Sequence, residues 1–582
     1  MGRGLKSGTI LALFLLGAIW GSSEAWAGDF RPWWDFRQWG MVAAPPERAR
    51  IYLDYMDQFQ RQGITVLMLN NPKSLPPFTP ERRFLADAAK RGIKVWLRTN
   101  RVSPKGGIPG VPNTTLDFAL NPDIQKQTLD YLLAMAKLST EFPNVVGLII
   151  GGEEWVGARV DKQALARHQA AGEKELGFNI TGSLSEAEKI QYFDWLQKIQ
   201  NRWYEKIWDT LKERYPKLEL FIYPSTIAVC GERWSSFPRA SYWDIYDLIV
   251  TRNRAFSVML GACTTEDPLG LYQTEAWGNY LRAATKGRVP FYLLLQSNRC
   301  GPKMKTPSPQ ELEADVLAAV AGGARGAGYW PVDMDTKKDI YETDKVRWQA
   351  MFAALAKGVQ VYPDTRKGSG LYVVKPRYSQ YWQPDNAQSI RTLAGLLRAG
   401  MAPDFLLVEQ VLAEPLPANA KIFYLPETYK YEKPQVLEKL LAAKKPIFFS
   451  LNPAEPQTPD KKPQTPLYGL LGLKKGPPSK LPSLQRVKVS WGDRTYEVDL
   501  DLPSPFPRWE ESKKLAKAVF TVEVDGKKET IPLAFSDGKL VFLAASDYLL
   551  LMKAKKDNQN AEFLKALLAG AGLPDKKSGA HP

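Results

Sequence analysis

The feature that most constrains the fold is a regular alternation of short apolar runs with longer helical segments over residues 29–360. Strands that alternate with helices are typical of parallel βα units. Eight such units can be counted, which is the number that forms a (β/α)8 barrel. The strands are expected at residues 30–39, 64–70, 93–99, 145–151, 218–223, 246–251, 289–296 and 326–332.

A second α/β pattern begins near residue 367, with strands expected at 371–374, 405–409, 422–425 and 447–450. This pattern predicts a Rossmann-like layer structure. Eight prolines in residues 452–482 indicate an exposed insertion, and residues 485–500 and 519–532 alternate like antiparallel strands. We therefore expect a barrel over residues 28–362 and an α/β domain over 366–582, with a Pro/Lys-rich and β-rich insertion at about 452–535.

The N-terminus has the pattern of an export signal. Arg3 and Lys6 precede an apolar run over residues 10–20, and Ala25 and Ala27 are small residues of the kind that a signal peptidase recognises. We expect a signal peptide at residues 1–27 and a secreted, periplasmic or cell-envelope protein. The run is shorter than the roughly 20 residues that span a bilayer, so no membrane span is expected after cleavage.

Composition excludes several classes of function. The formal charge of +16 comes from Lys and Arg scattered among acidic residues, whereas a nucleic-acid partner would require a basic cluster. Only His168 and His581 are histidines, which argues against a histidine-based metal site, and we expect no metal and no cofactor. The three cysteines, Cys230, Cys263 and Cys300, allow one disulfide and one free thiol.

Chemistry-bearing side chains are concentrated where the predicted barrel strands end. Active sites of such barrels lie at the C-terminal ends of the strands. Carbohydrate sites need flat aromatic faces, amide and guanidinium donors, and carboxyl groups that move protons. The predicted substrate-binding residues are Trp34, Asp35, Arg98, Asn100, Trp155, Tyr223, Arg252, Gln296, Asn298 and Trp330.

Glu153 and Glu154 are the strongest catalytic candidates. An apolar run over residues 145–150 leads into two glycines and then into this pair of carboxyl groups. Asp333, at the end of the eighth predicted strand, is a third catalytic candidate, although it could equally cap a helix or pair with an arginine.

The segment Val146-Gly147-Leu148-Ile149-Ile150-Gly151-Gly152-Glu153-Glu154 resembles the fourth strand of retaining clan A glycoside hydrolases, and most closely that of glycoside hydrolase family 42, the β-galactosidases. On this register Glu153 takes the place of the general acid/base, and Gly152 replaces the usual asparagine. The resemblance also implies an amidotransferase-like domain after the barrel and a homo-oligomer, a trimer, formed through it. Because no cysteine follows Cys300, that domain is expected to be structural.

The seventh predicted strand departs from this resemblance. The run Pro290-Phe291-Tyr292-Leu293-Leu294-Leu295-Gln296-Ser297 is similar to the family's nucleophile strand, but Leu295 stands where the nucleophilic glutamate is expected. A leucine cannot attack an anomeric carbon. A second carboxyl group would then come from Glu154, Asp333, Glu266 or Glu275.

Three functional hypotheses follow. The leading one is a secreted glycoside hydrolase-like protein that acts on an oligo- or polysaccharide, with Glu153 as general acid/base. The second is a catalytically inactive barrel that binds carbohydrate, which Leu295 favours. The third is a structural protein of the cell envelope, which would form an oligomer and bind no glycan.

Overall fold

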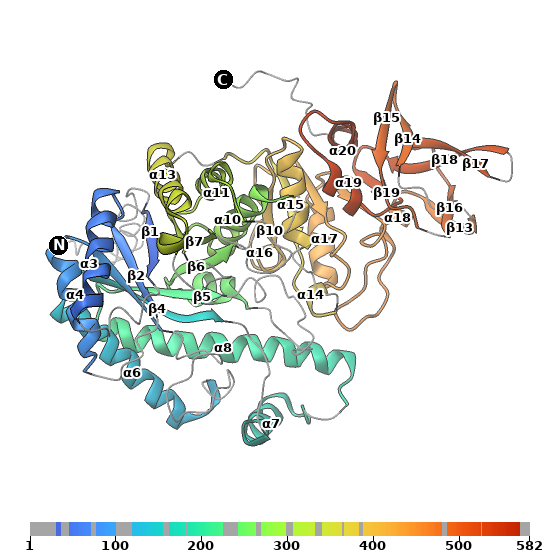
Figure 1. The fold of residues 1–582 in the computed structure, drawn as a ribbon. Coiled ribbons are helices and arrows are strands. Elements are labelled where there is room, and N and C mark those ends of the chain that lie inside the picture. Colours follow the sequence, from blue (N-terminus) through green and yellow to red (C-terminus); the bar gives the residue numbers. More distant parts are fainter. Residues whose placement is uncertain are drawn as a thin grey trace, which may run out of the picture.

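The computed structural model describes residues 31–36, 46–70, 77–99, 119–154, 162–180, 183–224, 243–262, 269–297, 306–331, 340–363, 366–382, 388–479, 486–503, 505–524 and 527–570 (Figure 1). The predicted signal peptide, residues 1–27, lies outside these residues. So do Cys230, Cys263 and Cys300, so their pairing stays a prediction.

The first part of the chain is a closed barrel of eight parallel strands, as predicted. The strands follow one another in chain order around the barrel, and β1 closes it by pairing with β8. They are β1 (Trp33–Phe36), β2 (Val66–Asn70), β3 (Lys94–Thr99), β4 (Val145–Glu154), β5 (Glu219–Pro224), β6 (Ser257–Ala262), β7 (Phe291–Gln296) and β8 (Gly326–Trp330).

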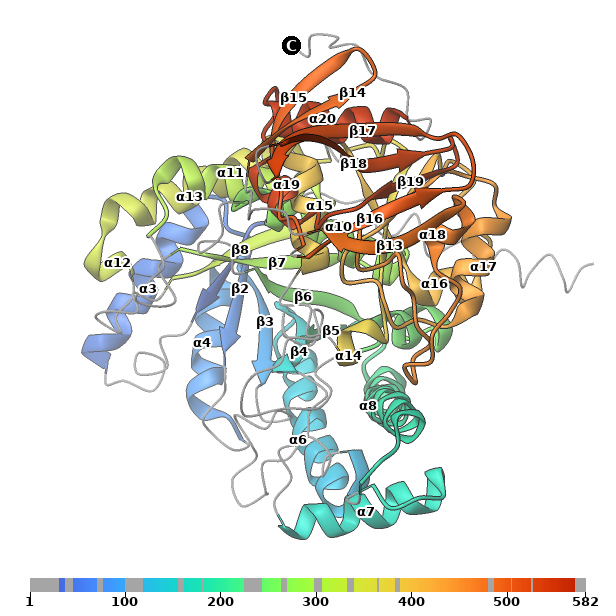
Figure 2. The ribbon, with the colours of Figure 1, turned by 90° about the vertical axis from the view of Figure 1, so that its right-hand side faces the viewer.

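Helices surround this barrel (Figure 2). They are α3 (Pro46–Arg61), α4 (Thr79–Lys90), α6 (Pro122–Glu141), α7 (Lys162–Leu176), α8 (Glu186–Arg214), α10 (Leu271–Thr285), α11 (Pro309–Ala321), α12 (Ile340–Thr343) and α13 (Lys345–Val361). Helix α8 begins in a capping box, in which Ser185 Oγ accepts from the backbone N–H of Glu188 and the Glu188 carboxylate accepts from that of Ser185. Its 29 residues make it about 43 Å long.

Alternate residues of the barrel strands face two different apolar regions. On β7, Tyr292 and Leu294 belong to the cluster that fills the barrel, whereas Leu293 and Leu295 belong to the larger core beneath the helices. The buried residues of the inner cluster are Trp33, Val66, Met68, Trp96, Ile149, Phe221, Tyr223, Met259, Tyr292 and Leu294.

Glycine makes room for the large rings inside the barrel. A Cβ atom on Gly147 would lie 2.6 Å from Trp96 Cδ1 and 2.8 Å from Phe221 Cε2. The rings of Trp96 and Phe221 have centroids 4.8 Å apart, and those of Trp96 and Tyr292 are 4.9 Å apart. The barrel is therefore a packed core rather than a channel.

The prediction of the sixth strand is wrong. Residues 246–251 were expected to form it, but Asp247–Thr251 is a π-helix, η2, and β6 begins at Ser257. The carboxylate of Asp244 accepts from the backbone N–H of Asp247, and Arg252 N donates to Asp247 O in the wider turn of a π-helix. The apolar run Leu248-Ile249 is buried against the rest of the core, so packing overrides its strand-like composition.

The second part is an α/β unit built on a nine-stranded sheet in the order β10-β9-β11-β12-β19-β18-β17-β14-β15. Its first five strands are parallel, and its last four are antiparallel. The parallel strands and their helices are β9 (Leu371–Lys375), α14 (Ser379–Trp382), α15 (Gln388–Arg398), β10 (Asp404–Leu407), α16 (Val408–Ala413), β11 (Ile422–Leu425), α17 (Pro434–Ala442), β12 (Ile447–Phe449), β19 (Leu540–Leu543), α19 (Tyr548–Lys553) and α20 (Gln559–Ala569).

The β-rich part lies between β12 and β19 in the sequence. It contains α18 (Leu467–Leu470), β13 (Leu473–Ser479), β14 (Arg486–Trp491), β15 (Arg494–Asp499), β16 (Phe506–Glu511), β17 (Ala516–Val524) and β18 (Lys527–Ser536). The proline-rich segment is less exposed than expected, because Ala454 and Leu467 are fully buried and β13 pairs with β16.

The edge strand β15 is covered by helix α20. The backbone N–H groups of Glu497 and Asp499 donate to the side-chain oxygens of Gln559 and Asn560. These side chains satisfy backbone groups that would otherwise be open to another strand.

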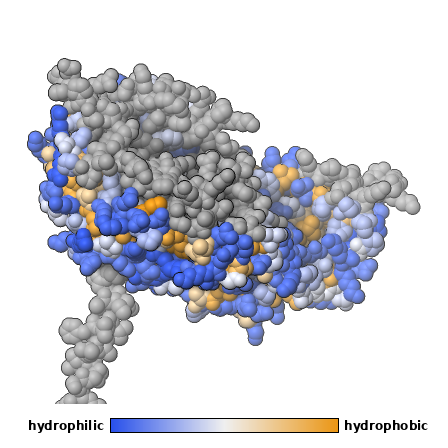
Figure 3. Space-filling model, turned by 90° about the horizontal axis from the view of Figure 1, so that it is seen from below, coloured by the Kyte–Doolittle hydropathy of each residue, from blue (hydrophilic) through white to orange (hydrophobic). Residues whose placement is uncertain are grey.

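One face of the described surface is mostly polar. On the face shown in Figure 3, hydrophilic residues predominate and apolar residues form small separate patches. None of the helices in the described ranges combines the length and the apolar content needed to cross a membrane.

Candidate functional site

Arg98 and Tyr223 lie together at the C-terminal end of the barrel. Arg98 is the fifth residue of β3, and its guanidinium carbon lies 4.3 Å from the centroid of the Tyr223 ring on β5. Both side chains are almost completely buried. Gly261 on β6 leaves space for this tyrosine, because a Cβ there would lie 3.1 Å from the Tyr223 hydroxyl. The pair places a cation and an aromatic ring at the strand ends.

Gln296 and Trp330 occupy the same end of the barrel on β7 and β8. The two residues are register partners, Gln296 is buried, and Trp330 packs against the inner cluster. Ser297, which the sequence did not single out, donates from its hydroxyl to the backbone carbonyl of Trp330. A serine directly after a predicted strand was the available signal for this contact.

Leu295 does not lie on the inner face of the barrel. Its side chain is 1% exposed and belongs to the core between the strands and the helices. Leu294 belongs to the cluster that fills the barrel, and Gln296, two residues later, is on the same face of the strand. On the face towards the barrel interior, the described end of β7 therefore carries an amide and no carboxyl group.

Glu153 and Glu154 form the end of β4, at the C-terminal end of the barrel, as expected. The register pairs Ile150 with Ile222 and Glu154 with Pro224, so β4 accommodates two extra residues between these pairs. Gly151, within this irregularity, has a φ of +85°, which favours glycine. The side chains of Glu153 and Glu154 lie outside the described structure.

Several other predicted residues cannot be placed as side chains. The backbone of Trp34 and Asp35 lies in β1, where Trp34 pairs with Leu67 and Asp35 with Met68. The residues that fall outside the described ranges are Asn100, Trp155, Asn298, Asp333 and Glu266.

The prediction that Arg252 binds substrate is corrected by the structure. It follows η2 and precedes β6, so it is on the N-terminal side of that strand rather than at the C-terminal end. Its guanidinium pairs with Glu205 on α8 at 2.9 Å and with Asp247 at 2.7 Å. Arg252 therefore joins η2 to α8, and the error follows from the wrong sixth strand.

Glu275 is also an unsuitable second carboxyl group for the barrel site. It lies in α10, and its carboxylate pairs with Arg366 at 2.8 Å, where the chain passes from the barrel to the α/β unit. Burial raises the pKa of Glu275, and the guanidinium groups of Arg366 and Arg282 oppose that shift.

The opposite end of the barrel is closed by a polar network that the sequence did not predict. Arg31 pairs with Glu219 at 3.1 Å, and Ser257 Oγ donates to the same carboxylate at 2.7 Å. The Tyr292 hydroxyl lies within hydrogen-bonding distance of both Arg31 and Glu219. These residues satisfy one another at the starts of the strands, so they support the fold rather than a site.

No group of His, Cys, Asp and Glu side chains suited to a metal ion occurs in the described ranges.

Solved structures of glycosidases share this architecture. A β-galactosidase from the psychrophilic Marinomonas ef1 has a TM-score of 0.65 at 12% identity, covering 94% of this chain and 92% of that chain. One from the haloarchaeon Halorubrum lacusprofundi has a TM-score of 0.63 at 12% identity, with coverages of 93% and 90%. Gan42B, a GH42 β-galactosidase from G. stearothermophilus, has a TM-score of 0.60 at 10% identity, with coverages of 93% and 88%.

No protein-family model matches the sequence, and no curated protein is significantly similar to it. The chain nevertheless shares the fold of these β-galactosidases, which confirms the resemblance at the level of fold. At identities this low, structural similarity establishes the fold only, and the chemistry has to be argued from the residues of the site.

Proposed function

We propose that this chain is an exported glycoside hydrolase-like protein that acts on a glycosidic bond of an oligo- or polysaccharide, with Glu153 as general acid/base. The observation that carries the proposal is that Arg98, Tyr223, Gln296 and Trp330 lie at the end of the barrel where β4 ends in Glu153 and Glu154. These residues supply guanidinium, aromatic and amide groups to a sugar, and a carboxyl group to move a proton.

Register supports Glu153 over its neighbour for this role. Glu154 is the register partner of Pro224. Glu153 and Tyr223 are the residues immediately before this pair on β4 and β5, and the Tyr223 side chain belongs to the inner cluster. Glu154 and Asp333 are the proposed sources of a second carboxyl group. A double displacement through β7 is unavailable, since Leu295 and Gln296 cannot act as a carboxylate nucleophile.

The test is hydrolysis of a broad panel of aryl glycosides and of plant and bacterial polysaccharides by the mature chain. Glu153→Gln is expected to lower kcat by about 10²–10⁴, because it removes a general acid/base. Glu154→Gln tests one proposed source of the second carboxyl group, and a loss of equal size there would make the two residues a pair. An absence of turnover on every substrate would contradict the hydrolase.

A carbohydrate-binding barrel without turnover is the second candidate, and the end of β7 favours it. If the wild type binds a glycan without cleaving it, and Glu153→Gln binds it equally well, the protein is a binding module. Loss of glycan binding in Arg98→Ala would then locate the binding at the barrel mouth.

The GH42-like trimer, formed through residues 366–582, remains part of the proposal. Light scattering of the mature chain measures its mass directly. A monomer at micromolar concentration would contradict it.

A further inference from the structure

Arg377 lies where the barrel and the α/β unit meet. It follows β9 by two residues, and its side chain is only 11% exposed. The guanidinium pairs with Asp194 on α8 at 3.0 Å, with Glu409 on α16 at 3.1 Å, and with Asp244, which precedes η2. One cation of the α/β unit thus holds two separate elements of the barrel.

The backbone that carries Arg377 is itself fixed. The buried carboxyl group of Glu432 accepts from the backbone N–H groups of Arg377 at 2.8 Å and of Ser379 at 3.0 Å. The Ser379 hydroxyl accepts in turn from the backbone N–H groups of Lys430 and Tyr431. The guanidinium is therefore presented from a rigid base rather than from a free loop.

Aromatic contacts accompany these ion pairs. The Tyr378 hydroxyl donates to the Asp194 carboxylate, and the Phe193 and Tyr381 rings lie 5.4 Å apart in an edge-on arrangement. Phe193 of α8 packs with Tyr378 and Tyr381, and Figures 1 and 2 both show the N-terminal part of α8 next to α14. The contact combines buried apolar area with charge pairing.

Both barrel elements held by Arg377 lead to the candidate site. Helix α8 is the long helix between β4 and β5, and it runs opposite to the strands, so its first turns lie towards their C-terminal ends. Asp244 lies on the segment that returns from the end of β5 towards β6. The two elements thus belong to the connections that follow β4, which carries Glu153, and β5, which carries Tyr223.

We propose that Arg377 is a positioning residue for the barrel mouth: from the α/β unit it fixes the starts of α8 and η2, and through them the strand ends of the candidate site. The positioning stands on this geometry, whereas its effect on a glycan rests on the proposed function. In this arrangement the α/β unit is a support for the site as well as a separate layer.

The charges around Arg377 give the contact a pH dependence. Three carboxyl groups pair with the guanidinium, those of Asp194, Asp244 and Glu409, and that of Glu432 accepts from the backbone N–H of the same residue, Arg377. Burial raises the pKa of Asp244 to about 6 and that of Glu432 to about 8, with Glu409 adding to both shifts. Among the described residues, further polar neighbours include the Tyr378 hydroxyl and Lys433, whose ammonium lies 5.4 Å from the Tyr378 ring.

The sign of this dependence follows from the raised values. An acid whose pKa is higher when the contact between the barrel and the α/β unit is formed binds its proton more tightly in that state than when the contact is broken. Mild acid therefore favours the formed contact. Without the guanidinium, a charged Asp244 is left buried and unpaired above its pKa, whereas a protonated one needs no cation. Loss of Arg377 is therefore expected to matter more at about pH 8 than at about pH 5.

The experiment is hydrogen exchange of the full chain in Arg377→Gln, Arg377→Lys and Asp194→Asn. Arg282→Gln is the matched control, because it breaks an ion pair with Asp404 at 2.6 Å that also joins the two units. In Arg377→Gln we expect exchange of residues 186–197 and 243–251 to rise at least about tenfold at pH 8 and less at pH 5. Arg377→Lys, which keeps the charge but loses the planar fork, should fall between it and the wild type.

The outcomes separate positioning from general stability. Equal exchange in Arg377→Gln and the wild type would overturn the proposal, and so would an equal rise in every segment or the same rise in Arg282→Gln. If Arg377→Gln fails to fold, Asp194→Asn decides, since it leaves the other two pairs of Arg377 in place.

A glycan identified for the wild type provides the functional readout. Arg377→Gln should then raise KM or Kd at least about threefold, with a partial return in Arg377→Lys. Exchange changes without any glycan binding in the wild type would support the positioning and contradict the proposed function. Unchanged exchange in Arg377→Gln, together with glycan binding by the wild type, would contradict the positioning and support the proposed function.

Discussion

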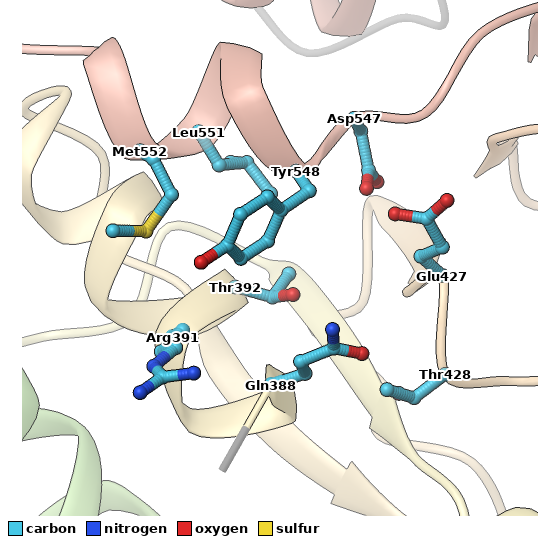
Figure 4. A pocket seen from close by; sticks show the side chains of 9 residues that line it. All are labelled: Gln388, Arg391, Thr392, Glu427, Thr428, Asp547, Tyr548, Leu551 and Met552. Atoms are coloured by element: carbon cyan, nitrogen blue, oxygen red, sulfur yellow. The ribbon is translucent and has the colours of Figure 1, made fainter. Parts of the chain in front are cut away.

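Parallel strands end in polar side chains at two places in this molecule, and the two places treat those side chains differently. At the barrel mouth, Arg98, Tyr223 and Gln296 come from three strands around the barrel. In the α/β unit, Glu427 follows β11 and Asp547 follows β19, and their carboxyl groups face each other (Figure 4).

The polar groups at these strand ends of the α/β unit form hydrogen bonds with neighbouring side chains. The Tyr424 hydroxyl donates to Asp547, and the Ser546 hydroxyl donates to Glu427 at 2.7 Å. Burial and the neighbouring Glu427 raise the pKa of Asp547 to about 8, and burial also raises that of Glu427. The cavity beside them holds about 10 Å³, which is room for one water molecule.

The comparison shows that a perturbed pKa does not by itself mark a ligand site. Among the described carboxyl groups, the large shifts lie in the α/β unit and at its contact with the barrel, where burial causes them. Structural networks perturb pKa values as strongly as catalytic ones do. The residue types at the barrel mouth, rather than titration, point to the function.

The largest expected effect tests the two faces of β7. Leu295→Glu would bury a carboxylate in the apolar core under the helices and should lower the free energy of unfolding by about 3–5 kcal/mol. Gln296→Glu, one residue later and beside the polar mouth, should cost clearly less. Urea denaturation at pH 7 measures both, and equal losses would refute the assigned faces.

The second test concerns the pH dependence of the α/β unit. Because the folded-state pKa of Asp547 is raised, its contribution is present at low pH and is lost as pH rises towards about 8. The free energy of unfolding should therefore fall between about pH 5 and 8, by up to about 1.4 kcal/mol per pH unit for each proton. Asp547→Asn should flatten this slope, whereas the exposed Glu438→Gln should leave it unchanged.

The smallest effect separates stability from ligand binding. Tyr424→Phe removes the donor to Asp547 and should cost about 1–3 kcal/mol of stability while leaving glycan affinity unchanged. Arg98→Lys should lower glycan affinity with little change in stability, because lysine keeps the charge but loses the planar guanidinium that lies over the Tyr223 ring. Thermal unfolding and glycan titration of both variants measure the two effects. If both variants lose stability and affinity alike, the α/β unit and the barrel mouth do not differ in the way described.

Much of the fold was predictable from the sequence. Seven of the eight barrel strands and the four parallel strands of the α/β unit before the insertion were predicted close to their observed positions. The exception shows the limit: Leu248-Ile249-Val250 has the composition of a strand, but a carboxylate cap from Asp244 and packing against α8 make it a π-helix.

The sequence by itself determined the βα repeat and the polar character of the strand ends. Only the tertiary structure decided which way each side chain faces and which charges meet. Leu293, Leu294 and Leu295 are chemically identical, and in a parallel strand buried on both faces no alternation distinguishes them. Closure of the barrel turned Leu294 inward and Leu295 outward, and the docking of two units brought Arg377 to carboxylates up to 183 residues away.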